Sequence, residues 1–276
     1  MKKPTINHII SIVEEKIAPP FLALPDDRIG LQVGRENEVV NGVLLCIDVT
    51  KEIINEAKEK GANLILAHHP LIFNPLTHLN FSNPSSDIVR EAIKNDISIY
   101  IAHTNLDAAP GGVNDCLVKV LKEELDIKKE ESLFILKNKE KFPLGKIVEL
   151  KERKMLKEIV LGVEKTLKPR YIKVGGIKNE KICKIALCGG SCMDLVYPAY
   201  KRGAELFITG ELGHHSCLEA KFLGLSVIEA GHYETEAVVL PFLKEKIQKQ
   251  LEQKDWQESI CIFISEICTS PYFILS

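Results

Sequence analysis

Short apolar runs alternate with amphipathic helical patterns along the first half of the chain. Residues 43–47 form an apolar run typical of a strand, and Thr50 and Gly61 are suitable ends for the helix that follows. The run 64–67 is typical of a short buried strand in a parallel sheet. These elements predict a βαβ unit, extended by a helix at 87–94, a strand at 97–102 and a helix at 113–125.

A further helix is expected at the start of the chain, where Thr5 can act as its cap and Pro19 and Pro20 must end it. The second half shows the same alternation of elements as the first. We expect a helix at 155–167, strands at 171–174, 182–187, 206–208 and 226–229, a long helix at 235–250 and a final strand at 260–264.

The two halves also resemble each other residue by residue. At a constant offset, Cys46, Ala57, Gly61, Ala62 and Leu64 align with a matching series in the second half, namely Cys188, Ala199, Gly203, Ala204 and Leu206. An internal match of this kind indicates a duplicated structural unit.

Polar residues follow the strands of both halves. One strand ends in Ala67-His68-His69-Pro70, and its counterpart ends in Thr209-Gly210-Glu211. The next strands are followed by His103 to Asp107 and by His232 to Glu236, both of the form His-x-x-x-acid. Because ligands of open α/β sheets bind at the carboxyl ends of the strands, these residues are candidates for a shared site.

The expected fold is therefore a duplicated α/β unit, with two similar halves whose sheets are flanked by helices and with a metal site in the cleft between them. We place the first half at residues 1–128 together with 226–276, and the second half at 129–225. Residues 125–152 are expected to hold only a connector, so no inserted third domain is predicted.

Composition excludes several classes of protein. The 276 residues are 45% hydrophobic and 27% charged, as in soluble globular proteins. A formal charge of −2 gives no bulk positive field for nucleic-acid binding, and no apolar run approaches the length of a membrane span. The eight cysteines include no C-x-x-C pair, so we expect reduced, mostly buried thiols in a cytoplasmic protein.

Imidazoles and carboxylates without matching thiolates suit zinc, iron, manganese or cobalt. Pro70 restricts His69 to extended geometry, which allows His68 and His69 to turn together beyond the strand. Each motif also has a simpler explanation: the histidine pair fits a solvated loop, and His-x-x-x-acid fits a hydrogen bond that holds a turn. The donors together are too many for one catalytic zinc, which favours two metal ions.

Glu211 and His215 are candidates for general acid or base, or for orienting the ligands. A capped helix start explains Glu211 equally well. Gly189-Gly190-Ser191 suits either a phosphate-binding turn or an ordinary tight turn. The signatures of P-loop, dinucleotide-binding and nucleophile-elbow proteins are absent from the sequence.

Several of these motifs together resemble those of the NIF-three-like family, also called the GTP cyclohydrolase 1 type 2 family. They are Gly30-Leu-Gln-Val-Gly34, Ala67-His-His-Pro70, His103-Thr-Asn-Leu-Asp107, Thr209-Gly-Glu211 and Gly231-His-Tyr-Glu-Thr-Glu236. The resemblance runs from about Ile6 to the last strand. It implies a duplicated α/β fold, two divalent transition-metal ions per chain (zinc, iron or manganese) and a homohexameric ring.

Matched residue by residue, the resemblance implies five metal ligands: His68, His69, Asp107, His232 and Glu236. His103 and His215 match family positions nearer the periphery of the metal site, and with Glu211 they are the candidate catalytic residues. The family usually has Trp-Asp-Asn before Val-Gly-Leu, whereas this chain has Asp26-Asp27-Arg28, so a substrate contact made by the aromatic or the amide is not carried over.

The resemblance favours a metal-dependent hydrolase of a small, nucleotide-like substrate, with GTP ring opening as the reaction implied by the family name. One alternative is a metal-binding, metal-handling or regulatory interaction protein without turnover. Another is a phosphoesterase that uses the same metal pair.

Overall fold

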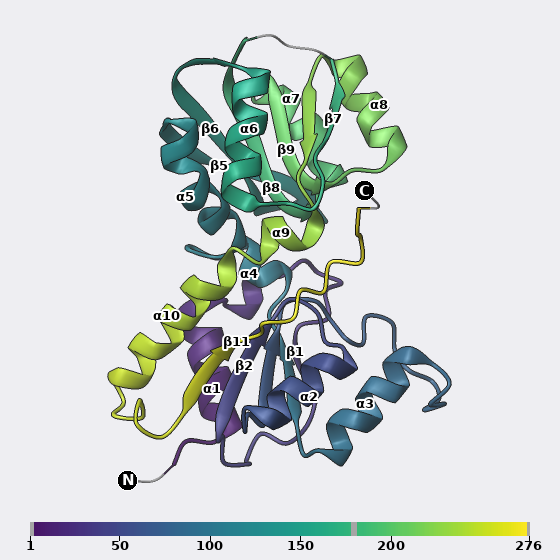
Figure 1. Ribbon diagram of the computed structural model, residues 1–276, viewed down its shortest axis with the longest axis vertical. Helices are drawn as coiled ribbons and strands as arrows, with labels where there is room; N and C mark the ends of the chain where they lie inside the picture. The colour runs from purple at the N-terminus through teal and green to yellow at the C-terminus, as the bar shows by residue number, and fades with distance from the viewer. Residues whose placement is uncertain (1–2, 178–180, 275–276) are drawn as a thin grey trace. The chain divides into compact units, whose positions relative to one another are not determined.

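The computed structural model describes residues 3–177 and 181–274, which form two compact units. The first unit comprises Met1–Pro110 and Leu240–Thr269, and the second comprises Gly111–Val239 and Ser270–Ser276. The expected boundaries, near residues 128 and 226, therefore differ from those of the compact units. Both units combine a mixed β-sheet with helices on its two faces (Figure 1). No helix of the described ranges has the length and apolar character needed to cross a bilayer.

In the described part of the first unit, five strands form a sheet in the order β1-β4-β3-β2-β11. β2, β3, β4 and β11 are parallel, and β1 pairs antiparallel with β4 at the edge. The strands are β1 (Gly30–Val33), β2 (Gly42–Cys46), β3 (Leu64–Ala67), β4 (Ser98–Ile101) and β11 (Cys261–Ile264). The chain therefore returns at its C-terminal end to complete the sheet that it began.

The helices of the first unit form because their apolar residues recur at helical spacing, and two of them have a side-chain cap at their start. Thr50 accepts a hydrogen bond from the Ile53 amide at the start of α2, as the sequence predicts, and Asn83 caps α3 in the same way. The helices are α1 (Ile6–Ile12), with a π-helical continuation at Val13–Ile17, a 3-10 turn at Pro20–Leu22, α2 (Lys51–Glu59), α3 (Pro84–Lys94), α4 (Thr104–Ala108) and α10 (Val239–Glu252).

In the described part of the second unit, six strands form a sheet in the order β5-β6-β8-β9-β10-β7. The strands are β5 (Ile127–Lys137), β6 (Glu140–Met155), β7 (Lys173–Gly176), β8 (Lys181–Ser191), β9 (Leu206–Glu211) and β10 (Ser226–Glu229). The helices are α5 (Val113–Leu125), α6 (Leu156–Leu167), a 3-10 turn at Met193–Leu195, α7 (Val196–Lys201), α8 (His214–Leu223) and α9 (His232–Glu236). Buried residues of α5 and α6 pack with those of β8, β9 and β10.

The register of the strands confirms the duplication. Cys46 pairs with Ala67 in the first unit, and their counterparts Cys188 and Thr209 pair in the second. The strands β2-β3-β4 and β8-β9-β10 are parallel in the same order, each with an antiparallel strand beyond the third. The prediction of two similar α/β halves with helix-flanked sheets is therefore confirmed.

Two expectations about local structure were wrong. Residues 125–152 are not a simple connector, because most of them form the hairpin β5–β6, whose turn residues Asn138 and Lys139 both have positive φ, as a two-residue hairpin turn requires. The long helix expected at 235–250 is also two helices, α9 and α10. Pro241 lies in the first turn of α10, where its missing amide hydrogen leaves no helical bond unmade.

Gly34 packs where no side chain fits. Its φ is +116°, and a Cβ atom there would collide with the side chain and backbone of Ser98. Gly30 has a similar φ of +101° but open space around the position of a Cβ.

Gly34→Ala should therefore lower the free energy of unfolding by about 1–3 kcal/mol more than Gly30→Ala, measured by urea denaturation. Equal losses in the two variants would show that backbone strain alone matters at Gly34.

Candidate metal centre

His68 and His69 follow β3 directly, and the backbone continues the parallel pairing past the end of the strand. The His68 amide donates to the Cys46 carbonyl at 3.1 Å, and the His69 amide donates to the Ile47 carbonyl at 2.8 Å. The His68 side chain is buried, and its Nδ1 lies 2.9 Å from the Ala102 carbonyl oxygen. A carbonyl oxygen only accepts, so Nδ1 carries the hydrogen and Nε2 presents a lone pair.

His69 and His103 are held in the same manner by carboxylates. His69 Nδ1 donates to Asp48 Oδ1 at 2.8 Å, and His103 Nδ1 donates to Asp27 Oδ1 at 2.7 Å. A metal-binding histidine usually donates its second ring nitrogen to such an acceptor, which fixes both its tautomer and its orientation. All three histidines therefore present a lone pair at Nε2, which can bind a metal ion or accept a proton.

These three imidazoles lie together in the first unit. Their ring centroids are 5.0 Å apart for His68 and His69, 5.3 Å for His68 and His103, and 5.8 Å for His69 and His103. One ring nitrogen from each lies within 4.8 Å of the others. The group could hold a divalent transition-metal ion, for which imidazole is a favoured donor.

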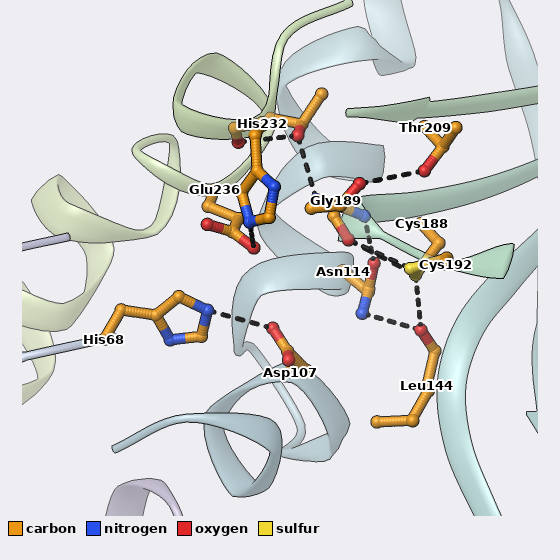
Figure 2. Close-up of a disulfide and its surroundings, with 12 residues drawn as sticks. His68, Asp107, Asn114, Leu144, Cys188, Gly189, Cys192, Thr209, His232 and Glu236 are labelled. Carbon is orange, nitrogen blue, oxygen red and sulfur yellow. Dashed lines mark hydrogen bonds and ion pairs between the residues drawn. A yellow bond between two sulfur atoms is a disulfide. The ribbon is translucent and has the colours of Figure 1, made fainter. Parts of the chain in front are cut away.

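Asp107 joins this group from the helix that follows β4. Its Oδ1 lies 3.5 Å from His68 Nε2 (Figure 2). A carboxylate oxygen and the lone-pair nitrogen of a neutral imidazole are both acceptors, so a cation near both atoms would suit the pair. His103 and Asp107, at opposite ends of the motif His-Thr-Asn-Leu-Asp, are thus both close to His68, as helical spacing allows.

The second unit contributes a histidine and two carboxylates. His232 and Glu236 occupy one face of α9, with Nε2 and Oε1 3.2 Å apart (Figure 2). Glu211, at the end of β9, places Oε1 3.2 Å from the other ring nitrogen of His232. Glu211 is therefore placed to orient His232 in the way that Asp48 and Asp27 orient the histidines of the first unit.

The end of β8 packs closely against the pair His232–Glu236. Gly190 has a φ of +67°, and a Cβ there would collide with Glu236 Oε1 and lie 3.2 Å from His232 Nε2. The Gly190 amide donates to Thr235 Oγ1, and the Thr209 hydroxyl donates to the Gly190 carbonyl, both at 3.0 Å. Glycine is thus required here by close approach to the side chains of Glu236 and His232. This close packing accounts for the glycine of an ordinary tight turn at position 190.

The same turn carries a disulfide between Cys188 and Cys192 (Figure 2). The expectation that all eight cysteines are reduced was therefore wrong in this structure. The Gly189-Gly190 turn brings together two sulfurs that are four positions apart in the sequence, one position more than in a C-x-x-C pair.

The three expected catalytic residues occupy different surroundings. His103 lies with His68 and His69, and Glu211 contacts His232. His215 is exposed in the first turn of α8, where its ring lies 5.5 Å from that of His214.

Asp27 and Asp48 are functional candidates that the motifs alone did not identify. Asp48 lies two residues beyond β2 and also accepts a hydrogen bond from the Thr269 hydroxyl. Asp27 also accepts hydrogen bonds from the amide and hydroxyl of Thr104. Two features of the sequence could have identified these acceptors. Asp48 is an acid just beyond a strand end, and Asp27 is the acid retained in Asp26-Asp27-Arg28.

The pKa of Asp27 reflects this network. Burial raises the pKa of its carboxyl group, but hydrogen bonds and electrostatic attraction from His103, with hydrogen bonds from Thr104 and the Arg28 amide, outweigh burial and lower the pKa to about 2. The carboxylate therefore stays charged at neutral pH and continues to accept the hydrogen bond from His103.

The chain matches a known protein family over almost its whole length. The family model described as Duf34/NIF3 (NGG1p interacting factor 3) matches residues 4–271. The chain is 37% identical over 247 residues to a GTP cyclohydrolase 1 type 2 homolog of Clostridium perfringens, covering 90% of this chain and 92% of the relative. A protein of the same description from Clostridium acetobutylicum is 30% identical over 269 residues, covering 97% of each chain.

A solved structure is similar over the full length. The crystal structure of a Bacillus cereus protein related to NIF3 superposes with a TM-score of 0.90 and 27% identity, covering 100% of both chains.

Asp27 offers a test of the histidine-orienting network. Because the pKa of Asp27 is lower in the folded protein than its ordinary value of 3.8, its stabilising effect is complete above that value and is lost as pH falls through about 2. Asp27→Asn should lower the free energy of unfolding by about 2 kcal/mol at pH 7 in metal-free protein, measured by urea denaturation. The difference from wild type should shrink below about pH 4.

The matched control is Asp26→Asn, which changes the exposed neighbouring carboxylate. It should leave the stability within about 0.5 kcal/mol of wild type. A loss of similar size in both variants, or a difference for Asp27→Asn that does not change between pH 7 and pH 2, would contradict the assignment.

Proposed function

Because the chain belongs to the Duf34/NIF3 family, we propose that it is a dinuclear metal-dependent hydrolase of nucleotide-like substrates, with GTP as the first candidate. The observation that carries the proposal is the group of three imidazoles at the end of β3 and β4, each held at Nδ1 by an acceptor. The names of the curated relatives supply the candidate substrate.

We propose that two divalent ions per chain, of zinc, iron or manganese, are held by His68, His69, Asp107, His232 and Glu236. Imidazole nitrogens and carboxylate oxygens suit these metals. A metal-binding histidine needs a hydrogen-bond acceptor for its second ring nitrogen, and the histidines of the first unit have one at Nδ1. Gly190 leaves room for the Glu236 carboxylate.

Two bound ions of this kind would lower the pKa of a water molecule and polarise the bond under attack. The residues of the chain would then position the substrate and move protons. In the proposed ring opening, water adds to C8 of guanine and a base accepts its proton. The C8–N9 bond then breaks, N9 takes up a proton, and C8 is left as a formamide on N7.

His103 is not among the five proposed ligands, and we propose it as that base. Its Nδ1 hydrogen is held by Asp27, so Nε2 is the atom that accepts a proton, and the charged Asp27 stabilises the imidazolium that results. Glu211 would keep His232 oriented, and His215, exposed on α8, would exchange protons with solvent.

A homohexameric ring is part of the same proposal. In the single chain, large apolar side chains of α7 and α8 are exposed, among them Tyr197, Leu218 and Phe222, the last with 90% of its surface accessible. An assembly that covers this surface would remove it from water. The cytoplasmic location expected from the sequence stays a prediction.

Elemental analysis tests the metal centre directly. Wild-type protein, stripped of metal and reconstituted with one divalent metal at a time, should retain about two equivalents per chain. His69→Ala and His232→Ala should each lower that content, while His78→Ala, which removes an exposed histidine outside the candidate centre, should not. A wild type without metal after reconstitution would refute the hydrolase mechanism.

A product screen separates the candidate reactions. The metal-loaded protein should convert GTP to a ring-opened product, detected by mass, and His69→Ala should lose this activity while His78→Ala keeps it. Cleavage of model phosphodiesters with GTP left intact would assign a phosphoesterase instead. Metal binding without any product would favour the non-catalytic, metal-handling alternative.

A further inference from the structure

The disulfide Cys188–Cys192 lies directly behind the ligand pair of the second unit. The peptide of Gly190, between the two cysteines, packs against the Glu236 carboxylate so closely that no side chain would fit. The Gly189 amide donates to Asn114 Oδ1 at 3.0 Å, and Gly190 is bonded to Thr235 and Thr209. A change in the backbone of this turn must therefore act on the position of Glu236.

The surroundings of the sulfurs suit the reduced state as well as the disulfide. Cys188 Sγ lies 3.0 Å from the Leu144 carbonyl oxygen, and Cys192 Sγ lies 3.0 Å from the Gly189 carbonyl oxygen (Figure 2). A thiol carries a hydrogen that such an oxygen can accept, whereas a disulfide sulfur does not. Each sulfur thus has an acceptor ready for it after reduction.

The two cysteines differ in access. Cys188 is buried in the strand, with 2% of its surface exposed, whereas Cys192 is partly exposed. An external thiolate can therefore reach Cys192 before Cys188. The bond closes a turn of only a few residues, so it restricts the unfolded chain less than a long loop would, and its main effect is local.

We propose that Cys188 and Cys192 are a reversible dithiol–disulfide pair, a redox modification site that tunes the metal affinity of the adjacent His232–Glu236 pair. This inference rests on the proposed function for the role of those two ligands. The disulfide holds the Gly189-Gly190 turn, and with it Glu236, in the binding geometry. The oxidised protein therefore binds metal more tightly than the reduced protein.

The chemistry requires a dithiol reductant. One of its thiolates attacks Cys192 Sγ, which forms a mixed disulfide and releases Cys188 as a thiolate that takes up a proton. The second thiol of the reductant, as a thiolate, attacks the mixed disulfide, forms a disulfide within the reductant and releases Cys192. In total, two electrons and two protons pass from the reductant to the cysteine pair.

The first measurement is a thiol count. Purified protein is oxidised mildly or reduced with dithiothreitol, and the reagent is removed under anaerobic conditions. The protein is then denatured and alkylated, and its peptides are analysed by mass spectrometry. Reduced protein should be alkylated at both Cys188 and Cys192, oxidised protein at neither, and a second round of reduction should restore both. A pair that never joins under oxidation would overturn the proposal.

The second measurement is metal affinity in each redox state. Mn²⁺ is the probe because it prefers carboxylate oxygens to thiolates, so it reports on Glu236 rather than on the reduced cysteines. Oxidised wild type should bind Mn²⁺ on the order of tenfold more tightly than reduced wild type, as expected when the support of a ligand is lost. Cys192→Ser should show the reduced affinity under both conditions, and Cys217→Ser, which leaves the pair intact, should keep the full response.

The outcomes separate this inference from the proposed function. Equal Mn²⁺ affinity in the two redox states would overturn the coupling and leave the metal centre standing. No Mn²⁺ binding in either state would refute the metal centre and the coupling with it, and the thiol count would still decide whether the pair is reversible.

Discussion

The common edge at which parallel strands end is the constraint on which the candidate ligands depend. In the first sheet Cys46, Ala67 and Ile101 are in register across β2, β3 and β4. Asp48, His69 and His103 each lie two residues further along their own strands. The hydrogen-bond ladder therefore brings residues that are far apart in the sequence to one edge of the sheet. Their side chains can contact one another there when they turn toward the same side of that edge.

The second sheet shows how a duplicated edge can diverge. Cys188, Thr209 and Glu229 are in register there, and the residues two positions on are Gly190, Glu211 and Gly231. The position of Asp48 in the first unit is thus taken by Gly190, whose missing side chain admits the Glu236 carboxylate. The first copy therefore has an acid at this strand end where the second has a glycine, and both copies carry an acid on the helix that follows the third parallel strand, Asp107 and Glu236.

Much of this arrangement could be predicted from the sequence, because buried parallel strands are continuous apolar runs and their ends carry the histidines. The hairpin β5–β6 was missed because β5 is mostly exposed and rich in charge, so its alternation is weak. The acceptors Asp27 and Asp48 and the disulfide were missed for another reason. Each depends on a contact across the fold or on a turn geometry that no local pattern specifies.

Because the first unit combines two separate segments of the chain, the two units can complete their folding at different stages of synthesis. β2 pairs with β11, which is close to the end of the chain, whereas nearly all of the second unit lies within the continuous segment Gly111–Val239. A nascent chain therefore exposes the open edge of β2 until β11 leaves the ribosome, by which time the second unit has all but its last few residues available for folding. A chaperone that shields unpaired strand edges during translation would find its target in β2.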